Sequence, residues 1–197
     1  MQITFDFIPT LLFAVVMLCW FVFAGTFLLR NKPPSPPDQK REPASLLGVA
    51  LQGLSYAIVW VVHRPMFTPP VSSFVVAIVA SVIAVVAAIG SVWLVTVALR
   101  TLGKEWSLTA RVVEGHQLAT AGPYAYVRHP IYTGMLGMLL ATGFAISYWP
   151  ALLVALVVFF VGTMIRVRSE ERLLRGAFGE QFEAYARRVP AILPGLY

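Results

Sequence analysis

The chain has 197 residues, of which 58% are hydrophobic and only 12% are charged. Soluble domains usually carry about a quarter charged residues, so the composition excludes an ordinary soluble protein, and the length suits one domain. The net charge of +6 does not indicate nucleic-acid binding, because the basic residues stand at the ends of apolar segments, as membrane topology requires. The single cysteine, Cys19, excludes an internal disulfide and a thiolate metal cluster, and we predict no metal site.

The first half of the chain contains three long apolar runs, at about 8–29, 44–62 and 74–99. Runs of about 18 or more apolar residues are typical of membrane-spanning helices. We expect the first run to be a retained helix and not a cleaved signal peptide, because Asp6 and no basic residue precedes it. Residues 30–43 contain five prolines, which predict a loop outside the hydrocarbon.

The second half begins with a polar, irregular segment at 100–128. Two shorter apolar stretches follow at 131–146 and 151–165, separated by a Ser-Tyr-Trp-Pro turn. Each is shorter than an ideal span, so we predict a tight helical hairpin, and whether its helices span the membrane fully is left open. The tail at 166–197 is charged, and we expect an amphipathic helix there to about Arg188.

The distribution of Lys and Arg predicts the orientation of these spans. Segments 30–43, 100–130 and 166–197 hold four, four and six basic residues, which is 14 of the 15 in the chain, and Arg64 is the exception. Because basic residues accumulate on the cytoplasmic side, these segments should be cytoplasmic. We therefore expect an integral protein of the bacterial inner membrane with its N-terminus outside and its C-terminus inside.

The predicted fold is an all-α integral membrane bundle of about five transmembrane helices. The last two helices form the hairpin, and the candidate cofactor site lies at the cytoplasmic face. We divide the chain into three N-terminal transmembrane helices at 1–100 and a core with the hairpin and helical tail at 101–197.

Polar side chains are concentrated just before the hairpin, from Gly122 to Tyr132, where an Arg, a His and three Tyr occur within a dozen residues. Pro130 suits the first turn of a helix, so His129 should stand at a helix N-terminus. Backbone N–H groups and the helix dipole favour a carboxylate or phosphate at such a place. The alternative is that Arg128 and the tyrosines only anchor the membrane interface.

A second polar cluster follows the last apolar stretch. Arg166 and Glu170 are four residues apart and can pair on one helical face, while Glu170 or Glu171 can instead bind a cation. The alternative is a solvated helix end. His116, in the segment before the hairpin, can contact a cofactor or substrate, and a structural hydrogen bond in a loop is an equal alternative.

Two ordered motifs resemble one known family. Leu118–Tyr124 (LATAGPY) and Arg128–Gly134 (RHPIYTG) resemble a signature of the isoprenylcysteine carboxyl methyltransferases and related phospholipid methyltransferases. Glu170-Glu171, then Phe178–Glu180 and Arg188–Pro190, resemble their second signature. The gap between the motifs, filled by the predicted hairpin, also matches, and the resemblance covers roughly residues 101–194.

This resemblance implies S-adenosylmethionine as methyl donor, S-adenosylhomocysteine as product, and membrane lipids and a lipophilic methyl acceptor as partners. The cofactor site it implies comprises His116, Leu118, Gly122, Tyr124, His129, Tyr132, Glu170 and Glu171. Glu170 or Glu171 would face the positive groups of the cofactor. Arg128 or Arg166 would orient an anionic group, so we assign catalytic roles to Arg128, Arg166 and Glu170.

Methyl transfer fits these residues physically. The reaction is an in-line displacement in which positioning supplies much of the catalysis. A carboxylate acceptor is ionised near pH 7 and needs no base, whereas an amine or phenol needs one, for which His129, His116 or a glutamate is available. A prenylated thiol-acid, a phospholipid amine and a small lipophilic molecule all remain open as acceptors.

Two other functions compete with this one. A membrane sterol or enone reductase would use NADPH, and the absence of a GxGxxG motif does not exclude it. A non-catalytic scaffold or a transporter subunit would need polar residues at mid-membrane, where this chain offers only Gln52 and a few Ser and Thr. The oligomeric state is open, since Gly137 and Ala141 can pack helices within one chain or between chains.

Overall fold

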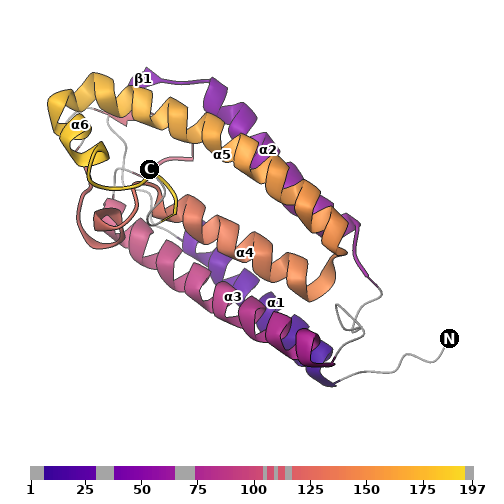
Figure 1. The fold of residues 1–197 in the computed structure, drawn as a ribbon. Helices are drawn as coiled ribbons and strands as arrows, with labels where there is room; N and C mark the ends of the chain where they lie inside the picture. The colour runs from indigo at the N-terminus through magenta and orange to yellow at the C-terminus, as the bar shows by residue number, and fades with distance from the viewer. Residues whose placement is uncertain are drawn as a thin grey trace.

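The computed structural model describes residues 7–29, 38–64, 74–103, 106–108, 111–113 and 117–193. These residues form a helical bundle with one very small sheet (Figure 1). The elements in chain order are α1 (Phe7–Leu28), β1 (Asp38–Arg41), α2 (Ala44–Val61), α3 (Phe74–Leu102), β2 (Arg111–Val113), a 3-10 helix η2 (Gly122–Ala125), α4 (Pro130–Ile146), α5 (Trp149–Phe178) and α6 (Glu180–Ala186). The two strands pair antiparallel.

Four helices of the described chain, α1, α2, α3 and α5, are long and apolar enough to cross a membrane. The helix α4 is equally apolar but has only 17 residues, which places it at the lower limit for a span. The protein is therefore an integral membrane helical bundle, as the composition predicts. The predicted division of the chain at residue 100 stays a prediction.

The sequence left open whether the hairpin helices span the membrane fully, and α5 is long and apolar enough to do so. This helix has 30 residues, because the charged segment after Ile165 continues the same helix without a proline. It ends where Gly179 takes a positive φ of 51°, a conformation that glycine adopts without steric cost. The predicted tail helix is thus split between the end of α5 and the short α6.

The helices form two layers (Figure 1). In one layer α2 packs along α5, and in the other α3 packs along α4 and α1. Close helix contact needs small residues, and Gly137 of α4 provides one: a Cβ atom at this position would lie 2.4 Å from the Oγ of Ser91 on α3. Gly137 and the fully buried Ala141 therefore pack inside this chain.

Apolar side chains fill both the interior and the outer surface. Leu139 and Phe159 are fully buried between the layers, and Met138 is fully buried against α1 and α3 within one layer. Large apolar side chains on the outer faces of α1 and α3 are exposed, for example Leu18 and Val86, as lipid contact allows. This distribution leaves the polar side chains of the helices to be satisfied inside the bundle.

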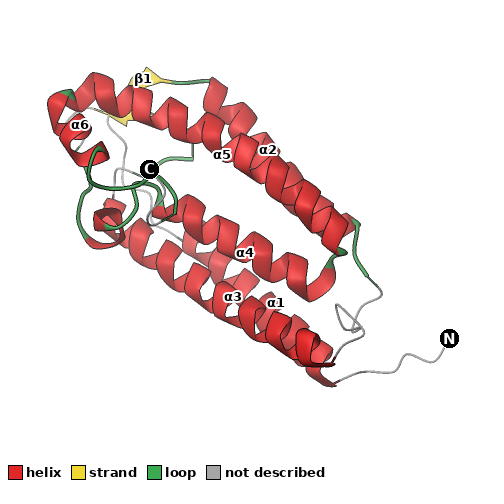
Figure 2. Ribbon diagram, viewed as in Figure 1, coloured by secondary structure: helices red, strands yellow, loops and turns green. Residues whose placement is uncertain are grey.

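The two layers are joined at the α4–α5 turn, and the connecting loops gather at the opposite end (Figure 2). The loop before α4 and the segment after α6 meet there, beside the charged end of α5. Backbone hydrogen bonds join them, from Arg128 N–H to the carbonyl of Pro190 (2.8 Å) and from His129 N–H to that of Ala191 (2.9 Å). This end of the molecule holds the candidate site.

Candidate active site

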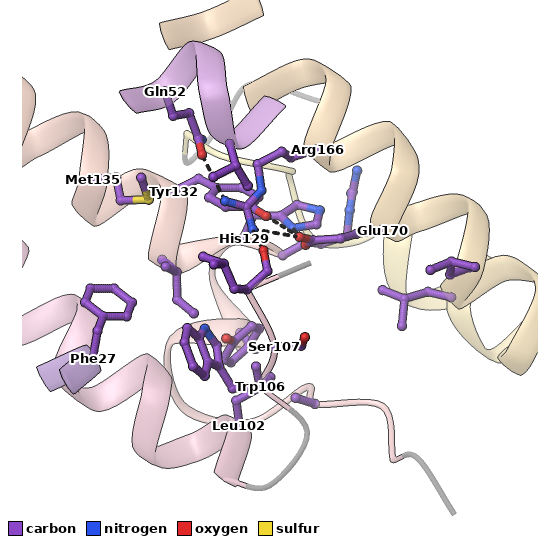
Figure 3. A pocket seen from close by; sticks show the side chains of 18 of the residues that line it. Phe27, Gln52, Leu102, Trp106, Ser107, His129, Tyr132, Met135, Arg166 and Glu170 are labelled. Carbon is purple, nitrogen blue, oxygen red and sulfur yellow. Dashed lines mark hydrogen bonds and ion pairs between the residues drawn. The ribbon is translucent and has the colours of Figure 1, made fainter. Parts of the chain in front are cut away.

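A cavity of about 390 Å³ lies between the two layers, at the end where the loops gather (Figure 3). Its polar wall comes from α2, α4, α5 and the two residues that directly precede α4. Its apolar wall comes from α1, α2, α4 and the segment after α3. The polar wall comprises Gln52, Arg128, His129, Tyr132, Arg166 and Glu170, and the apolar wall includes Phe23, Phe27, Tyr56, Leu102, Trp106 and Met135.

His129 is the N-cap residue of α4, and Pro130 is the first residue of that helix. Proline suits this position because its fixed φ matches the helix and its missing N–H leaves no donor unpaired. The bond from His129 N–H to the Ala191 carbonyl and the bond from the Tyr132 N–H to the His129 carbonyl (3.0 Å) use two backbone donors at this helix start. The C-terminal segment thus holds the imidazole in place over the end of α5.

His129 joins the two glutamates of α5. Its Nδ1 lies 3.3 Å from Oε2 of Glu170, and its Nε2 lies 3.4 Å from Oε1 of Glu171. Burial favours the neutral imidazole, but the two carboxylates outweigh it, and the pKa of His129 is raised above its ordinary value. The imidazole therefore links the first motif to the second through both of its ring nitrogens.

Glu170 faces the cavity and has two further neighbours, Tyr132 and Arg166. The Tyr132 hydroxyl donates to its Oε1, and Nη2 of Arg166 lies 3.8 Å from the same oxygen. The Tyr132 ring stacks on the ring of His129 at 5.6 Å between centroids. The predicted pairing of Arg166 with Glu170 is thus present, and the cluster of four side chains forms one wall of the cavity (Figure 3).

Arg166 is buried and held from three sides. Its Nη1 donates to the side-chain oxygen of Gln52 (3.0 Å) and its Nη2 donates to the carbonyl of Leu108 (2.6 Å). Its guanidinium carbon lies 4.8 Å from the centroid of the Tyr132 ring. Because arginine keeps its charge at any ordinary pH, Arg166 is a fixed positive charge on the cavity wall.

Arg128, which also lines the cavity, forms a second ion pair with Glu171. The Nε of Arg128 lies 2.9 Å from Oε1 of Glu171, and its Nη1 donates to the carbonyls of Ala186 and Val189. Nη2 of Arg175 lies 3.1 Å from the other oxygen of Glu171. Arg128 therefore uses its donors on the protein, and among the described residues Glu171 does not line the cavity.

The remaining predicted site residues divide into three groups. Leu118 and Tyr124 line the cavity, and the carbonyl of Tyr124 accepts a 2.6 Å bond from the hydroxyl of Tyr185. Gly122 does not line it: with a φ of 58° it forms the turn into η2, which only glycine adopts freely. His116 lies outside the described residues.

The sequence reasoning missed Gln52 as a site residue. It treated this amide only as a polar group within a span, and no local pattern connects it with Arg166, which is 114 positions away. The available signal was a single amide in the middle of an apolar helix, four residues after Gly48. Such a group must find a buried partner.

Comparisons with known proteins identify the family of the chain. A family model described as phospholipid methyltransferase matches residues 79–181, just over half of the 197-residue chain. The chain is 35% identical over 79 residues to Protein-S-isoprenylcysteine O-methyltransferase of Schizosaccharomyces pombe, covering 40% of this chain and 34% of that protein. It is 32% identical over 99 residues to Protein-S-isoprenylcysteine O-methyltransferase B of Arabidopsis thaliana, covering 49% of this chain and 50% of that protein.

A third relative carries a different description. The Cobalt-zinc-cadmium resistance protein CzcN of Cupriavidus metallidurans is 35% identical over 116 residues, covering 51% of this chain and 46% of that protein. The chain thus spans between about a third and a half of the length of these relatives. The matched region contains α4, α5 and the cavity wall that they form, and the chain belongs to the phospholipid methyltransferase family.

Proposed function

We propose that this protein transfers a methyl group from S-adenosylmethionine to a lipophilic acceptor at the cytoplasmic membrane face. The observation that carries the proposal is that charged side chains line one side of the cavity and apolar side chains line the other. A buried cluster of His129, Tyr132, Arg166 and Glu170 stands on one side, and an apolar wall continues from it between the layers. A polar cofactor and a lipid-soluble acceptor need these two environments next to each other.

The cavity suits the cofactor in size and chemistry. Small-molecule sites are typically about 300–1,000 Å³ and carry a few placed polar groups among apolar ones, and this cavity has about 390 Å³. Glu170 presents carboxylate oxygens to it beside Tyr132, which suits a cationic amino or sulfonium group. When bound, S-adenosylmethionine supplies an electrophilic methyl group on a positively charged sulfur.

The surroundings of His129 support an acceptor that is already ionised. Its two ring nitrogens face carboxylate oxygens of Glu170 and Glu171, which raise the pKa of the imidazole and so disfavour the unprotonated form that a general base needs. A carboxylate acceptor needs no base near pH 7. It needs a cation to hold it, and Arg166 provides a fixed one on the cavity wall.

The apolar wall supports a lipid tail on that acceptor. Phe23 and Phe27 of α1 face the cavity opposite Met135 of α4, and none of these side chains offers a charge. A hydrocarbon chain bound here is removed from water, which favours binding by about 25 cal/mol for each Å² of apolar surface buried. We therefore propose an S-prenylcysteine-like or other lipid carboxylate, presented to the cytoplasmic side of a bacterial inner membrane.

Calorimetry on the detergent-purified protein tests the cofactor assignment, with S-adenosylhomocysteine and NADPH titrated in parallel. We expect micromolar binding of S-adenosylhomocysteine that is lost in His129→Ala and Glu170→Ala. The matched control is Glu180→Gln, an exposed glutamate at the start of α6, which should bind as the wild type does. Binding of NADPH alone would replace the proposal with a reductase, and binding of neither ligand would favour a non-catalytic scaffold.

A further inference from the structure

We propose that Gln52 of α2 is a positioning residue for the reaction: it holds the Arg166 guanidinium in the orientation that receives the acceptor. The inference rests on the proposed function, because it assigns Arg166 to the acceptor. It adds a residue from outside the matched family region, which begins at residue 79. The site would then depend on an N-terminal helix as well as on the two motifs.

The first observation is that Gln52 is buried in the membrane-spanning part of the bundle and fully engaged. Its side chain is 2% exposed. The amide nitrogen donates to Oγ1 of Thr163 (2.9 Å), and the amide oxygen accepts from Nη1 of Arg166 (3.0 Å). Burying a polar group without partners is costly, and here both ends of the amide are bonded to α5. This orientation assigns the oxygen to the arginine.

The second observation is that the helices are shaped to bring Gln52 there. Gly48 and Gly162 face each other where α2 crosses α5: a Cβ atom on Gly48 would lie 2.6 Å from the carbonyl oxygen of Gly162. The same atom would lie 2.4 Å from Cγ of Arg166. Glycine at both positions therefore lets the backbone of α2 approach the stem of Arg166, and Gln52, one turn further along, reaches its head.

The third observation is the geometry around the guanidinium. Gln52 holds Nη1, the carbonyl of Leu108 holds Nη2, and the ring of Tyr132 lies against the flat face. Oε1 of Glu170 lies 3.8 Å from Nη2 of Arg166, on the cavity side. Without Gln52, Nη1 of the flexible arginine would lose its partner, and the guanidinium would be free to turn and tighten its 3.8 Å pairing with this carboxylate. The neutral amide thus keeps the positive charge available without cancelling it.

An amide and a carboxylate at position 52 should therefore behave differently. The amide oxygen of Gln52 lies 3.0 Å from Nη1 of Arg166. A glutamate at this position would place a negative charge there, and this charge would compete with an anionic acceptor. Leucine has a similar size and would remove both hydrogen bonds. Hydrogen bonds to a charged group correspond to roughly ten- to hundredfold in an equilibrium constant.

The test measures methyl transfer from S-adenosylmethionine to an S-farnesylated cysteine derivative with a free carboxylate, together with the Kd for S-adenosylhomocysteine. We expect Gln52→Leu to raise the acceptor KM by roughly ten- to hundredfold and Gln52→Glu to raise it at least as much. The Kd for S-adenosylhomocysteine should stay within about threefold of the wild-type value, a smaller change than the loss of one hydrogen bond to a charged group would produce. Thr163→Val, which removes the anchor of the amide but does not line the cavity, should give a smaller rise in the same direction.

Ser55→Ala is the matched control. Ser55 is a fully buried polar residue of α2 whose hydroxyl donates to the backbone carbonyl of Gln52 on its own helix, so its loss perturbs α2 without removing a bond to Arg166. It should leave KM and Kd unchanged. An unchanged KM in Gln52→Leu, or equal changes in KM and Kd, would overturn the inference while leaving the proposed function standing. A wild-type protein that binds no S-adenosylhomocysteine would overturn both.

Discussion

The two candidate arginines of the site differ in what their donors bind. Both line the cavity, but Arg128 is bonded to Glu171 and to the carbonyls of Ala186 and Val189, whereas Arg166 is held by the neutral amide of Gln52 and the carbonyl of Leu108. The sequence alone made either of them a candidate for orienting an anion. The contacts favour Arg166 for that role and give Arg128 the role of joining the first motif to the chain end.

Arg128→Lys should therefore destabilise the protein more than it changes the cavity. Lysine keeps the charge but cannot bond a carboxylate and two carbonyls with one planar group. We expect a loss on the order of 2 kcal/mol, typical of hydrogen bonds to charged groups, seen as a fall of roughly 4–8 °C in Tm for a protein of this size. Thermal unfolding in detergent measures it.

Arg175→Lys is the control for this change, because Arg175 contacts the same Glu171 from a half-exposed position. Exposed ion pairs contribute little, so its Tm should stay within about 2 °C, which corresponds to less than 1 kcal/mol. An equal fall in both variants would contradict the structural role of Arg128.

His129 should make stability depend on pH. Burial opposes its charge, but the neighbouring Glu170 and Glu171 raise the pKa above the ordinary value, so the folded protein keeps the proton to a higher pH than the unfolded chain does. The resulting stabilisation is complete below the unfolded pKa of about 6.5 and is lost as the pH rises through the folded pKa. Other charges that face this network are Arg128 and Arg166.

Thermal unfolding from pH 5.5 to pH 9 checks this expectation. The Tm of the wild type should fall across the upper part of this range, and His129→Gln should flatten the fall by removing the titrating group. His63→Gln, at the other end of the molecule beside Ser147, should keep the wild-type slope. A flat wild-type profile, or the same slope in His129→Gln, would show that the imidazole is not held in its protonated form.

At the scale of the elements, the contact between α2 and α5 determines whether Gln52 reaches the site. Gly48→Ala would place a Cβ atom 2.6 Å from the carbonyl oxygen of Gly162, where only movement of a backbone can relieve the clash. Overpacking of this kind costs about 1–3 kcal/mol, and we expect a lower Tm in detergent. Gly90→Ala is the control, because a Cβ atom there meets nothing within 4 Å, and it should be at least as stable as the wild type.

Most helices could be predicted from the sequence, because apolar runs of span length are a local signal. The runs at 44–62 and 74–99 correspond to α2 and α3. The end of α5 could not be found in this way: hydropathy changes at Arg166, but helix continues to Phe178, since charged residues also favour helix. Helix extent and membrane extent are different properties, and only the second follows hydropathy.

For the whole molecule, the sequence could not show which helices share a layer. Motif order placed the first motif near Glu170, and the structure confirms that His129 and Glu170 are neighbours. The bond between Gln52 and Arg166 depends on the packing of α2 on α5, and no short-range pattern encodes such a pairing. Most of the predicted motif residues line the cavity, but Gly122 and Glu171 do not, and Gln52 of an N-terminal helix was missed.

The layered arrangement also indicates where a lipid acceptor would enter. The helix α1 packs on α3 and α4, and α2 packs on α5, yet both α1 and α2 line the cavity through Phe27 and Gly53. Deeper in the bundle, the Trp20 ring closes the space between them, 5.2 Å from the ring of Tyr56. We propose that the acceptor passes between α1 and α2 at the level of Gly53, while the cofactor arrives from the loop end.

Gly53→Trp tests this route. Gly53 is exposed and a Cβ atom there meets nothing within 4 Å, so an indole should be tolerated by the fold while obstructing the cavity mouth. The acceptor KM should rise by roughly tenfold or more, equivalent to about 1.4 kcal/mol, with the Kd for S-adenosylhomocysteine unchanged. Gly90→Trp is the matched control, since Gly90 is equally exposed and unobstructed on α3 but does not line the cavity. If both tryptophans gave the same kinetics, the acceptor would not pass Gly53. If Gly53→Trp weakened acceptor and cofactor equally, the two ligands would have to share one entrance.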